Sequence, residues 1–196
     1  MLKCYLVLPC LLIVSALALV ACSSSGNSDE SQIEEAVETS ATNTDPANCT
    51  KVSTQNFLEQ TTQSKGSEAL KTCEKEASED TGAKSVAVSN VEVEGSKATA
   101  DAALSGGGFD GQEVEVALVK EGDQWKLDEL AGFVKFDEAK VIATLEKEFA
   151  KPSSEVSKSL ASCITNAFEE APQAEFEQAL LNQSTKGFEE LAGACF

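Results

Sequence analysis

The sequence predicts an α+β fold, in which N-terminal helices pack on a four-stranded antiparallel sheet and a small helical unit follows. Three observations support this fold class. Apolar residues recur at helical spacing between positions 49 and 79, alternate with polar residues between 86 and 127, and return to helical spacing after 132. A chain of 196 residues is long enough for one compact domain and a small appendage.

The N-terminus has the layout of a secretory signal, because Lys3 precedes an apolar run that ends at Ala21. A transmembrane helix needs about 20 apolar residues. This run is shorter, is interrupted by Pro9 and Ser15, and is followed by no basic cluster. We therefore expect residues 1–21 to be a signal peptide.

The end of this run, Leu19-Val20-Ala21-Cys22, resembles the lipobox of bacterial lipoproteins. In that family the cysteine thiol receives a diacylglycerol and the signal is cut just before it. The resemblance implies that Cys22 is the lipid attachment point. Two acyl chains make a durable anchor, so the expected location is the cell membrane, with the protein lipid-anchored and facing outside the cytoplasm.

Residues 22–47 are predicted to be a lipidated, flexible tether. Ser, Thr, Asn, Asp and Glu dominate this segment, and its only large apolar residues are Ile33 and Val37. Such a composition buries too little apolar surface to offset the entropy of ordering.

Four cysteines remain after the signal and the lipid site, and an even number in an exported domain predicts disulfides. Four cysteines allow three pairings. We favour Cys49–Cys73 with Cys163–Cys195, because each pair lies within one local unit. A zinc site is not expected, because the four cysteines have no CxxC spacing.

Residues 48–150 are predicted to form the α+β domain. Its helical part, between Cys49 and Glu79, is broken at Gly66, and the first strand changes phase at Ser89-Asn90, which predicts a β-bulge. The apolar positions of the other three strands are Ala98, Ala100, Ala102 and Leu104; Val114, Val116 and Leu118; Trp125 and Leu127. Each strand is bounded by Gly, Asp or Ser, as in antiparallel hairpins.

Two hairpins, "VSNVEVEGSKATADAAL" and "GQEVEVALVKEGDQWKLDEL", are similar to those of the nuclear-transport-factor-2-like superfamily, over about residues 48–135. The resemblance implies a cone, in which a curved sheet wraps around the helices and leaves a pocket between them. Strand parity places Glu129 on the same face as Trp125 and Leu127. The candidate pocket residues are Phe109, Trp125, Leu127 and Glu129.

The resemblance implies no particular activity, because that superfamily includes enzymes, carriers and assembly modules. Its epoxide hydrolases use an Asp-Arg-Asp arrangement, and its steroid isomerases pair a carboxylate with a tyrosine. This chain has no arginine, and its one tyrosine, Tyr5, lies in the predicted signal. No catalytic residues are therefore assigned, and an enzyme is the less favoured class.

Residues 151–196 are predicted to be a helical unit held by the Cys163–Cys195 disulfide. The preceding helix, which Pro152 ends, is assigned to the α+β domain. Within the unit, Pro172 opens a second helix and Ser184 caps a third.

The net charge of −18 argues against nucleic acid as a partner. No metal or cofactor is expected, since the chain has no histidine.

The leading hypothesis is a non-catalytic lipoprotein that binds another envelope protein, and it predicts an exposed apolar patch. The second is a carrier of an apolar small molecule, which predicts a cavity. An enzyme with Glu129 as its base comes third, and the oligomeric state stays open.

Overall fold

The computed structural model describes residues 25–79, 82–151, 156–182 and 185–196. The predicted signal peptide, the lipid attachment point Cys22 and the predicted helix cap Ser184 lie outside the described residues. The elements are α1 (Ser25–Ala41), α2 (Asn48–Lys51), α3 (Gln55–Thr62), α4 (Ser67–Ser78), β1 (Ser85–Glu94), β2 (Lys97–Ser105), β3 (Glu113–Glu121), β4 (Gln124–Lys135), α5 (Glu138–Phe149), α6 (Lys158–Glu170), α7 (Gln173–Leu181) and α8 (Thr185–Ala192), with a final 3-10 turn (Gly193–Cys195).

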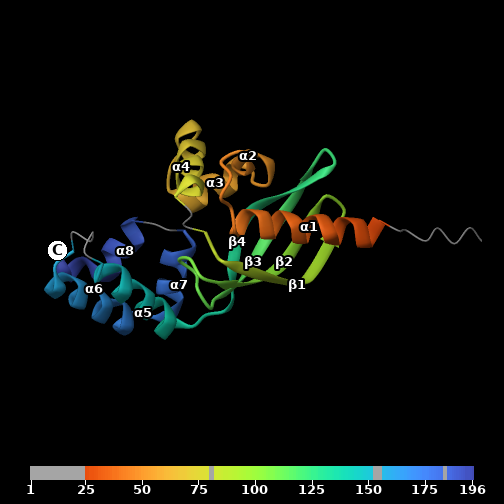
Figure 1. Cartoon of the computed structure of the whole chain (residues 1–196). Helices are drawn as coiled ribbons and strands as arrows, with labels where there is room; N and C mark the ends of the chain where they lie inside the picture. Colours follow the sequence, from red (N-terminus) through yellow and green to blue (C-terminus); the bar gives the residue numbers. More distant parts are fainter. Residues whose placement is uncertain (1–24, 80–81, 152–155, 183–184) are drawn as a thin grey trace, which may run out of the picture.

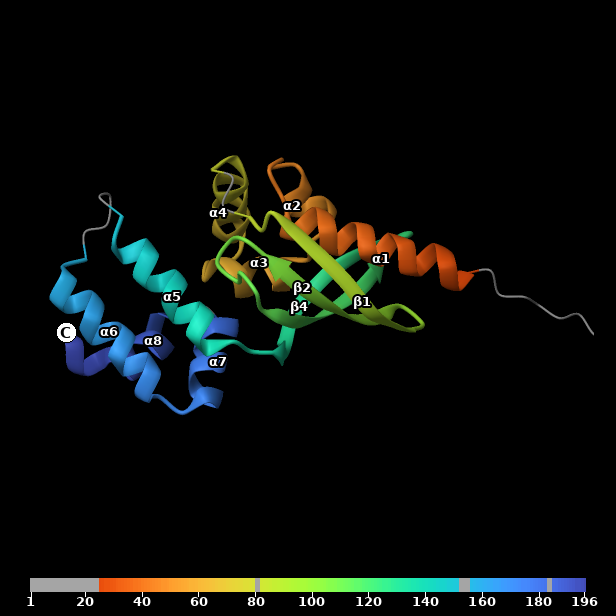
Figure 2. The same cartoon turned by 60° about the horizontal axis from the view of Figure 1, so that its bottom comes forward.

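The molecule is α+β, as predicted, and is elongated (Figure 1). The sheet and helices α1 to α4 form one end, and helices α5 to α8 form the other; a second view shows the same division (Figure 2). Within the described part of the chain, no helix is both long and apolar enough to span a membrane.

The sheet has the strand order β1-β2-β3-β4, and every neighbouring pair is antiparallel. Two tight turns join the hairpins, and each begins with a glycine at positive φ, Gly95 at 66° and Gly122 at 64°. These turns confirm the predicted hairpins, because a two-residue hairpin loop needs a residue that tolerates positive φ. On one face, the alternating apolar residues of β2, β3 and β4 are buried and form the main core.

The β-bulge predicted at Ser89-Asn90 is present. The register of β1 against β2 shifts between Ser89, which pairs with Asp101, and Glu92, which pairs with Thr99. Asn90 adopts a positive φ of 50°, and its Nδ2 donates a hydrogen bond of 2.7 Å to Asp101 Oδ2. Asn tolerates this backbone region better than most residues do, which explains the site of the phase change.

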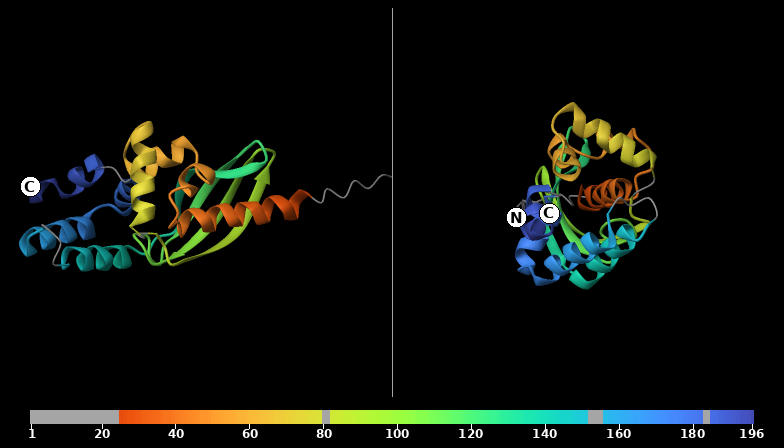
Figure 3. Two further views of the ribbon diagram at one scale, coloured as in Figure 1. Left: turned by 45° about the horizontal axis from the view of Figure 1, so that its top comes forward. Right: turned by 90° about the vertical axis from the view of Figure 1, so that its left-hand side faces the viewer.

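Helix α1 corrects the prediction of a flexible tether. Residues 25–41 are helical, and α1 lies along the sheet (Figure 3). Ile33, Ala36 and Val37 are at most 3% exposed and belong to the main core. Their i, i+3, i+4 spacing forms a narrow apolar stripe. The prediction rested on the average composition of the segment, in which so narrow a stripe does not show. The stripe packs against the apolar face of the sheet, and this contact stabilises the helix.

Asp29 fixes the first turns of α1 to the sheet. Its Oδ1 accepts hydrogen bonds from Lys120 Nζ at 2.5 Å and from Trp125 Nε1 at 3.0 Å. These two hydrogen bonds lower the pKa of Asp29 below its ordinary value of 3.8, and the bond from Lys120 has the larger effect. Lys120 Nζ also lies 5.5 Å from the centre of the Trp125 ring, within cation–π range.

Helices α2, α3 and α4 form a small cluster beside the sheet, and the predicted Cys49–Cys73 disulfide joins α2 to α4 with an S–S distance of 2.02 Å. Cys49, Leu58, Ala69 and Ala77 make its core. The predicted break before α4 falls at Gly66, whose φ is 55°. Only glycine adopts this conformation readily.

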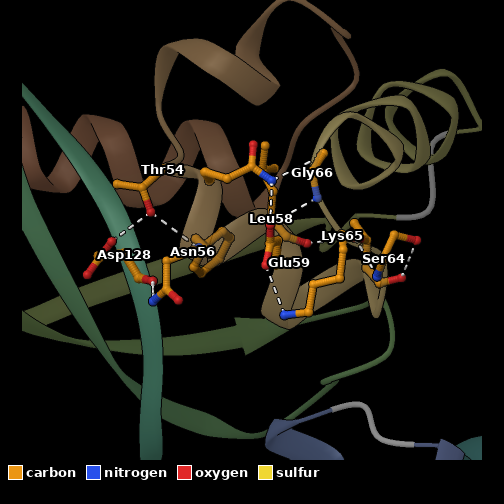
Figure 4. A network of polar contacts seen from close by, with 11 residues as sticks. Thr54, Asn56, Leu58, Glu59, Ser64, Lys65, Gly66 and Asp128 are labelled. Atoms are coloured by element: carbon orange, nitrogen blue, oxygen red, sulfur yellow. Dashed lines mark hydrogen bonds and ion pairs between the residues drawn. The ribbon is translucent and has the colours of Figure 1, made fainter.

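Polar side chains bind α3 to β4 (Figure 4). Thr54 Oγ1 donates to Asp128 Oδ1 at 2.7 Å, and Asn56 Nδ2 donates to the Asp128 carbonyl at 2.8 Å. One turn further along α3, the Gln60 amide bonds both the N–H and the carbonyl of Leu130. Because these bonds pair the outer edge of β4, they cover an edge that would otherwise be open to another strand.

Glu59 makes unfolding sensitive to acid. Hydrogen bonds from Lys65 Nζ at 2.9 Å, from the Gly66 N–H at 2.9 Å and from Gln55 lower its pKa from 4.5 to about 2. Ionised Glu59 therefore stabilises the fold above pH 4.5, and this contribution is lost as the pH falls from 4.5 towards 2.

We expect Glu59→Gln to lower the midpoint of urea unfolding at pH 7, and we expect the difference from the wild type to shrink steadily below pH 4.5. The other carboxylates titrate in both proteins, so the difference isolates Glu59. Salt should reduce the part that is due to Lys65, which is exposed. A difference that stays constant between pH 7 and pH 3 would contradict this prediction.

The C-terminal helices share a second core, and α5 belongs to it. Val141 and Ile142 of α5 pack with Ile164, Phe168 and Phe176. The predicted boundary at residue 150 therefore assigns α5 to the α+β domain, whereas α5 packs with the C-terminal helices. The spacing of apolar residues shows which face of a helix is apolar, but it does not show what that face packs against. The predicted Cys163–Cys195 disulfide is present, with an S–S distance of 2.08 Å. Pro172 immediately precedes α7, as predicted.

Two features join the helical unit to the sheet. The Gln112 side chain, which is 1% exposed, accepts from the Asp137 N–H at 2.7 Å and donates to the Asp137 carbonyl at 3.1 Å. Aromatic rings continue the contact, because Phe136 lies 4.8 Å from Phe133 and 5.7 Å from Phe176 between ring centres. A buried amide with both groups paired fixes the chain between β4 and α5.

Candidate functional site

An apolar cavity of about 240 Å³ lies between the core face of the sheet and helices α1, α3 and α4. Its floor is formed by strand residues, among them Ala102, Val114, Val116 and Leu127. Ala102 pairs with Val114 in the sheet register, and its short side chain leaves space above the floor. Larger side chains on β2 would extend into that space.

Three helices form the walls. Val37 and Ala41 of α1 lie on one side, and Phe57 and Leu58 of α3 lie on another. Cys73, Glu76 and Ala77 come from α4. The Cys49–Cys73 disulfide therefore holds a wall of the cavity as well as stabilising the fold.

A glycine-rich loop, residues 106–109, completes the cavity. Gly106 N donates to Asp110 Oδ1 at 2.6 Å, and Gly111 N donates to the Leu104 carbonyl at 2.8 Å, so internal hydrogen bonds shape the loop. Gly107 has a φ of 69°, and a Cβ there would lie 3.1 Å from the backbone of residues 82 and 83. This close approach accounts for a glycine at position 107.

The lining is almost free of charge. Among the described residues that line the cavity, Glu76 alone is ionisable, because Cys73 is in a disulfide. Partial burial raises the pKa of Glu76 above its ordinary value of 4.5, and the nearby carboxylate of Glu79 adds a smaller effect in the same direction. The residue as a whole is exposed, so it lies where the cavity opens to solvent.

The structure brings together two of the four predicted pocket residues. Phe109 and Leu127 line the cavity, whereas Trp125 and Glu129 do not. Trp125 is 3% exposed and lies in the core, where its Nε1 bonds Asp29 of α1.

Glu129 is exposed because the pairing of β3 with β4 shifts by one residue. Leu127 pairs with Leu118, but Glu129 pairs with Ala117, so Asp128 is the extra residue on β4. A one-residue shift moves the side chains that follow it to the other face, up to the next shift, which lies between Val116 and Glu115 of β3. Leu130 therefore takes the place on the cavity wall that parity assigns to Glu129. Glu129, predicted as a pocket residue, therefore does not line the cavity.

The lining residues that the prediction missed come from the helices, from the strands and from the glycine-rich loop. The α1 wall was assigned to the tether, although the spacing of Ile33 and Val37 offered a weak helical signal. No local signal distinguishes Glu76 from the other exposed glutamates of α4. Within the part of the chain that the structure describes, no group of three or more Cys, Asp or Glu side chains is placed to hold a metal ion.

No protein-family model, curated protein or solved structure matches this chain.

Proposed function

We propose that this protein is a lipid-anchored, extracytoplasmic carrier of a small apolar molecule, which it binds in the cavity between the sheet and helices α1, α3 and α4. The observation that supports binding is the cavity itself, about 240 Å³ and lined mainly by apolar side chains. Small-molecule sites are typically concave, apolar and furnished with few polar groups. Helices on one face of a four-stranded antiparallel sheet, with a cavity between, also support the cone-like arrangement of the nuclear-transport-factor-2-like superfamily as the proposed fold.

The proposed anchor is Cys22, on the strength of the lipobox-like Leu19-Val20-Ala21-Cys22. Helix α1 begins at Ser25, so only two residues separate Cys22 from the helix. The start of α1 lies at the end of the molecule opposite the helical unit (Figure 1). The proposal therefore holds the sheet close to the membrane and directs helices α5 to α8 away from it.

A neutral fluorescent probe, N-phenyl-1-naphthylamine, tests the cavity. Residues 23–196 contain every described helix and strand and are used without detergent, which would compete for an apolar site. We expect the wild type to bind the probe and Ala102→Leu to weaken binding about tenfold or more, because the added side chain occupies the cavity floor.

Ala103→Leu is the matched control for this experiment. It makes the same change on the next residue of β2, whose side chain points to the other face of the sheet. Equal binding by both variants would contradict the proposed site. Failure of the folded wild type to bind the probe would favour the alternative, a module that binds another envelope protein.

A further inference from the structure

We infer that the molecule carried in this cavity has one neutral oxygen atom, of a hydroxyl or a carbonyl group, which forms a hydrogen bond with the hydroxyl of Ser53. This inference rests on the proposed carrier function and names the class of ligand, an apolar alcohol or ketone. It goes further because the apolar walls by themselves would accept a hydrocarbon equally well.

Ser53 lies between α2 and α3, and it lines the cavity. It pairs with Leu127 of β4 in a parallel β-bridge, in which the Leu127 N–H donates to the Val52 carbonyl at 2.9 Å and the Thr54 N–H donates to the Leu127 carbonyl at 2.8 Å. Paired residues of a sheet project to the same face, and their neighbours in extended chain project to the other. The Ser53 side chain therefore lies on the cavity face with Leu127, whereas Thr54 bonds Asp128 on the opposite face (Figure 4).

The Ser53 hydroxyl makes no hydrogen bond within the described residues, although Ser53 is only 6% exposed. In the same part of the chain, no fully buried side-chain oxygen or nitrogen lacks a hydrogen-bond partner. Ser53 Oγ is therefore not fully buried, and the space that it reaches is the cavity that Ser53 lines. An apolar ligand without a polar group would leave this hydroxyl unpaired, which costs binding free energy, whereas a ligand oxygen pairs it.

The other neutral polar side chains of the lining need a ligand less. Thr61 Oγ1 donates to the Phe57 carbonyl at 2.9 Å, and Asn43 Oδ1 accepts a backbone N–H at 2.9 Å. Ser40 of α1 is only half-buried, so water reaches it. Ser53 is thus the lining hydroxyl for which a bound molecule has to supply the partner.

The ligand oxygen at Ser53 is neutral. Val52 and Leu127, which flank Ser53, are both buried in the main core. A charged group would lose its water among these apolar side chains, and one hydroxyl does not compensate for that loss. Glu76, the one ionisable residue of the described lining, already has an interaction within the chain. A serine hydroxyl donates to a carbonyl or a hydroxyl and accepts from a hydroxyl, so it suits a ketone or an alcohol.

Three compounds with the same carbon skeleton test this inference: ethylbenzene, acetophenone and 1-phenylethanol, which carry a methylene, a ketone and an alcohol at the same carbon. Each displaces N-phenyl-1-naphthylamine from residues 23–196 at pH 7, with the affinity of each variant for the fluorescent probe measured separately. We expect Ser53→Ala to weaken acetophenone and 1-phenylethanol about fivefold and to leave ethylbenzene unchanged, because only the oxygenated compounds lose a hydrogen bond. A loss for one oxygenated compound alone would support the inference and restrict the class to ketones or to alcohols.

Ser31→Ala is the matched control, because it makes the same change at an exposed position of α1 outside the cavity lining. It should leave the affinity of all three compounds unchanged. Unfolding by urea without ligand is the second measurement. Since the Ser53 hydroxyl has no partner among the described residues, Ser53→Ala should not lower the midpoint of unfolding.

An equal effect of Ser53→Ala on all three compounds, no effect on either oxygenated compound, or a lower midpoint of unfolding would overturn the assignment of Ser53 and leave the carrier proposal intact. Failure of all three compounds to displace the fluorescent probe would also overturn this inference. Failure of the fluorescent probe itself to bind the folded wild type would overturn the carrier proposal as well.

Discussion

Replacing Ile33 by aspartate is expected to unfold the sheet end of the molecule under conditions in which the wild type is folded. Ile33 is fully buried in α1 and packs in the main core with Val37. The substitution removes a large buried side chain and leaves a charge without a partner in an apolar site. Each effect alone costs several kcal/mol, so together they exceed about 4 kcal/mol, a large part of the stability of a typical domain.

Trp125 fluorescence measures this loss, because Trp125 is the only tryptophan and bonds Asp29 of the same helix. Ser31→Asp is the matched control, since it introduces the same charge on an exposed position two residues earlier. We expect that variant to change the free energy of unfolding by no more than about 0.5 kcal/mol. If Ile33→Asp unfolded like Ser31→Asp, residues 25–41 would behave as a tether rather than as part of the core.

Removing the Cys163–Cys195 disulfide by a double substitution to serine is expected to melt the helical unit while the sheet stays folded. The bond closes a loop of 32 residues, which corresponds to about 3–4 kcal/mol in the chain-entropy model. The unit is small, and its second core is formed by side chains of α5 to α8. A loss of that size is therefore a large part of what holds these helices together.

Two signals separate the two ends of the molecule in this experiment. Circular dichroism at 222 nm reports all helices, whereas Trp125 reports only the sheet end, because no other tryptophan is present. We expect the helical signal of the double variant to fall at a lower temperature than the tryptophan signal. Coincident transitions for both signals would contradict this, and would mean that the Gln112 and Phe136 contacts couple the two ends into one cooperative unit.

Most of the sheet could be predicted from the sequence, but few of the residues that line the cavity could. Strand positions, hairpin turns, the bulge at Ser89-Asn90 and the break at Gly66 depend on residues within a few positions of one another. The favoured disulfide pairing rested on the same locality, because the partners of each pair are 24 and 32 residues apart. The cavity instead draws on α1, α3, α4 and the sheet, so two of its four predicted residues were misplaced.

By itself, then, the sequence determined the α+β class and the antiparallel order of the strands, since local periodicity and local turns encode them. It favoured the observed disulfide pairing among three possible ones, and the structure decided between them. Only the tertiary structure decided that α1 packs in the core, that α5 belongs with the C-terminal helices and that Leu130 rather than Glu129 faces the cavity. Two physical reasons account for these outcomes. The apolar face of a helix shows that the helix needs a partner but not which partner, which applies to α1 and α5. A one-residue shift against the neighbouring strand moves the side chains that follow it to the other face, which applies to Glu129 and Leu130.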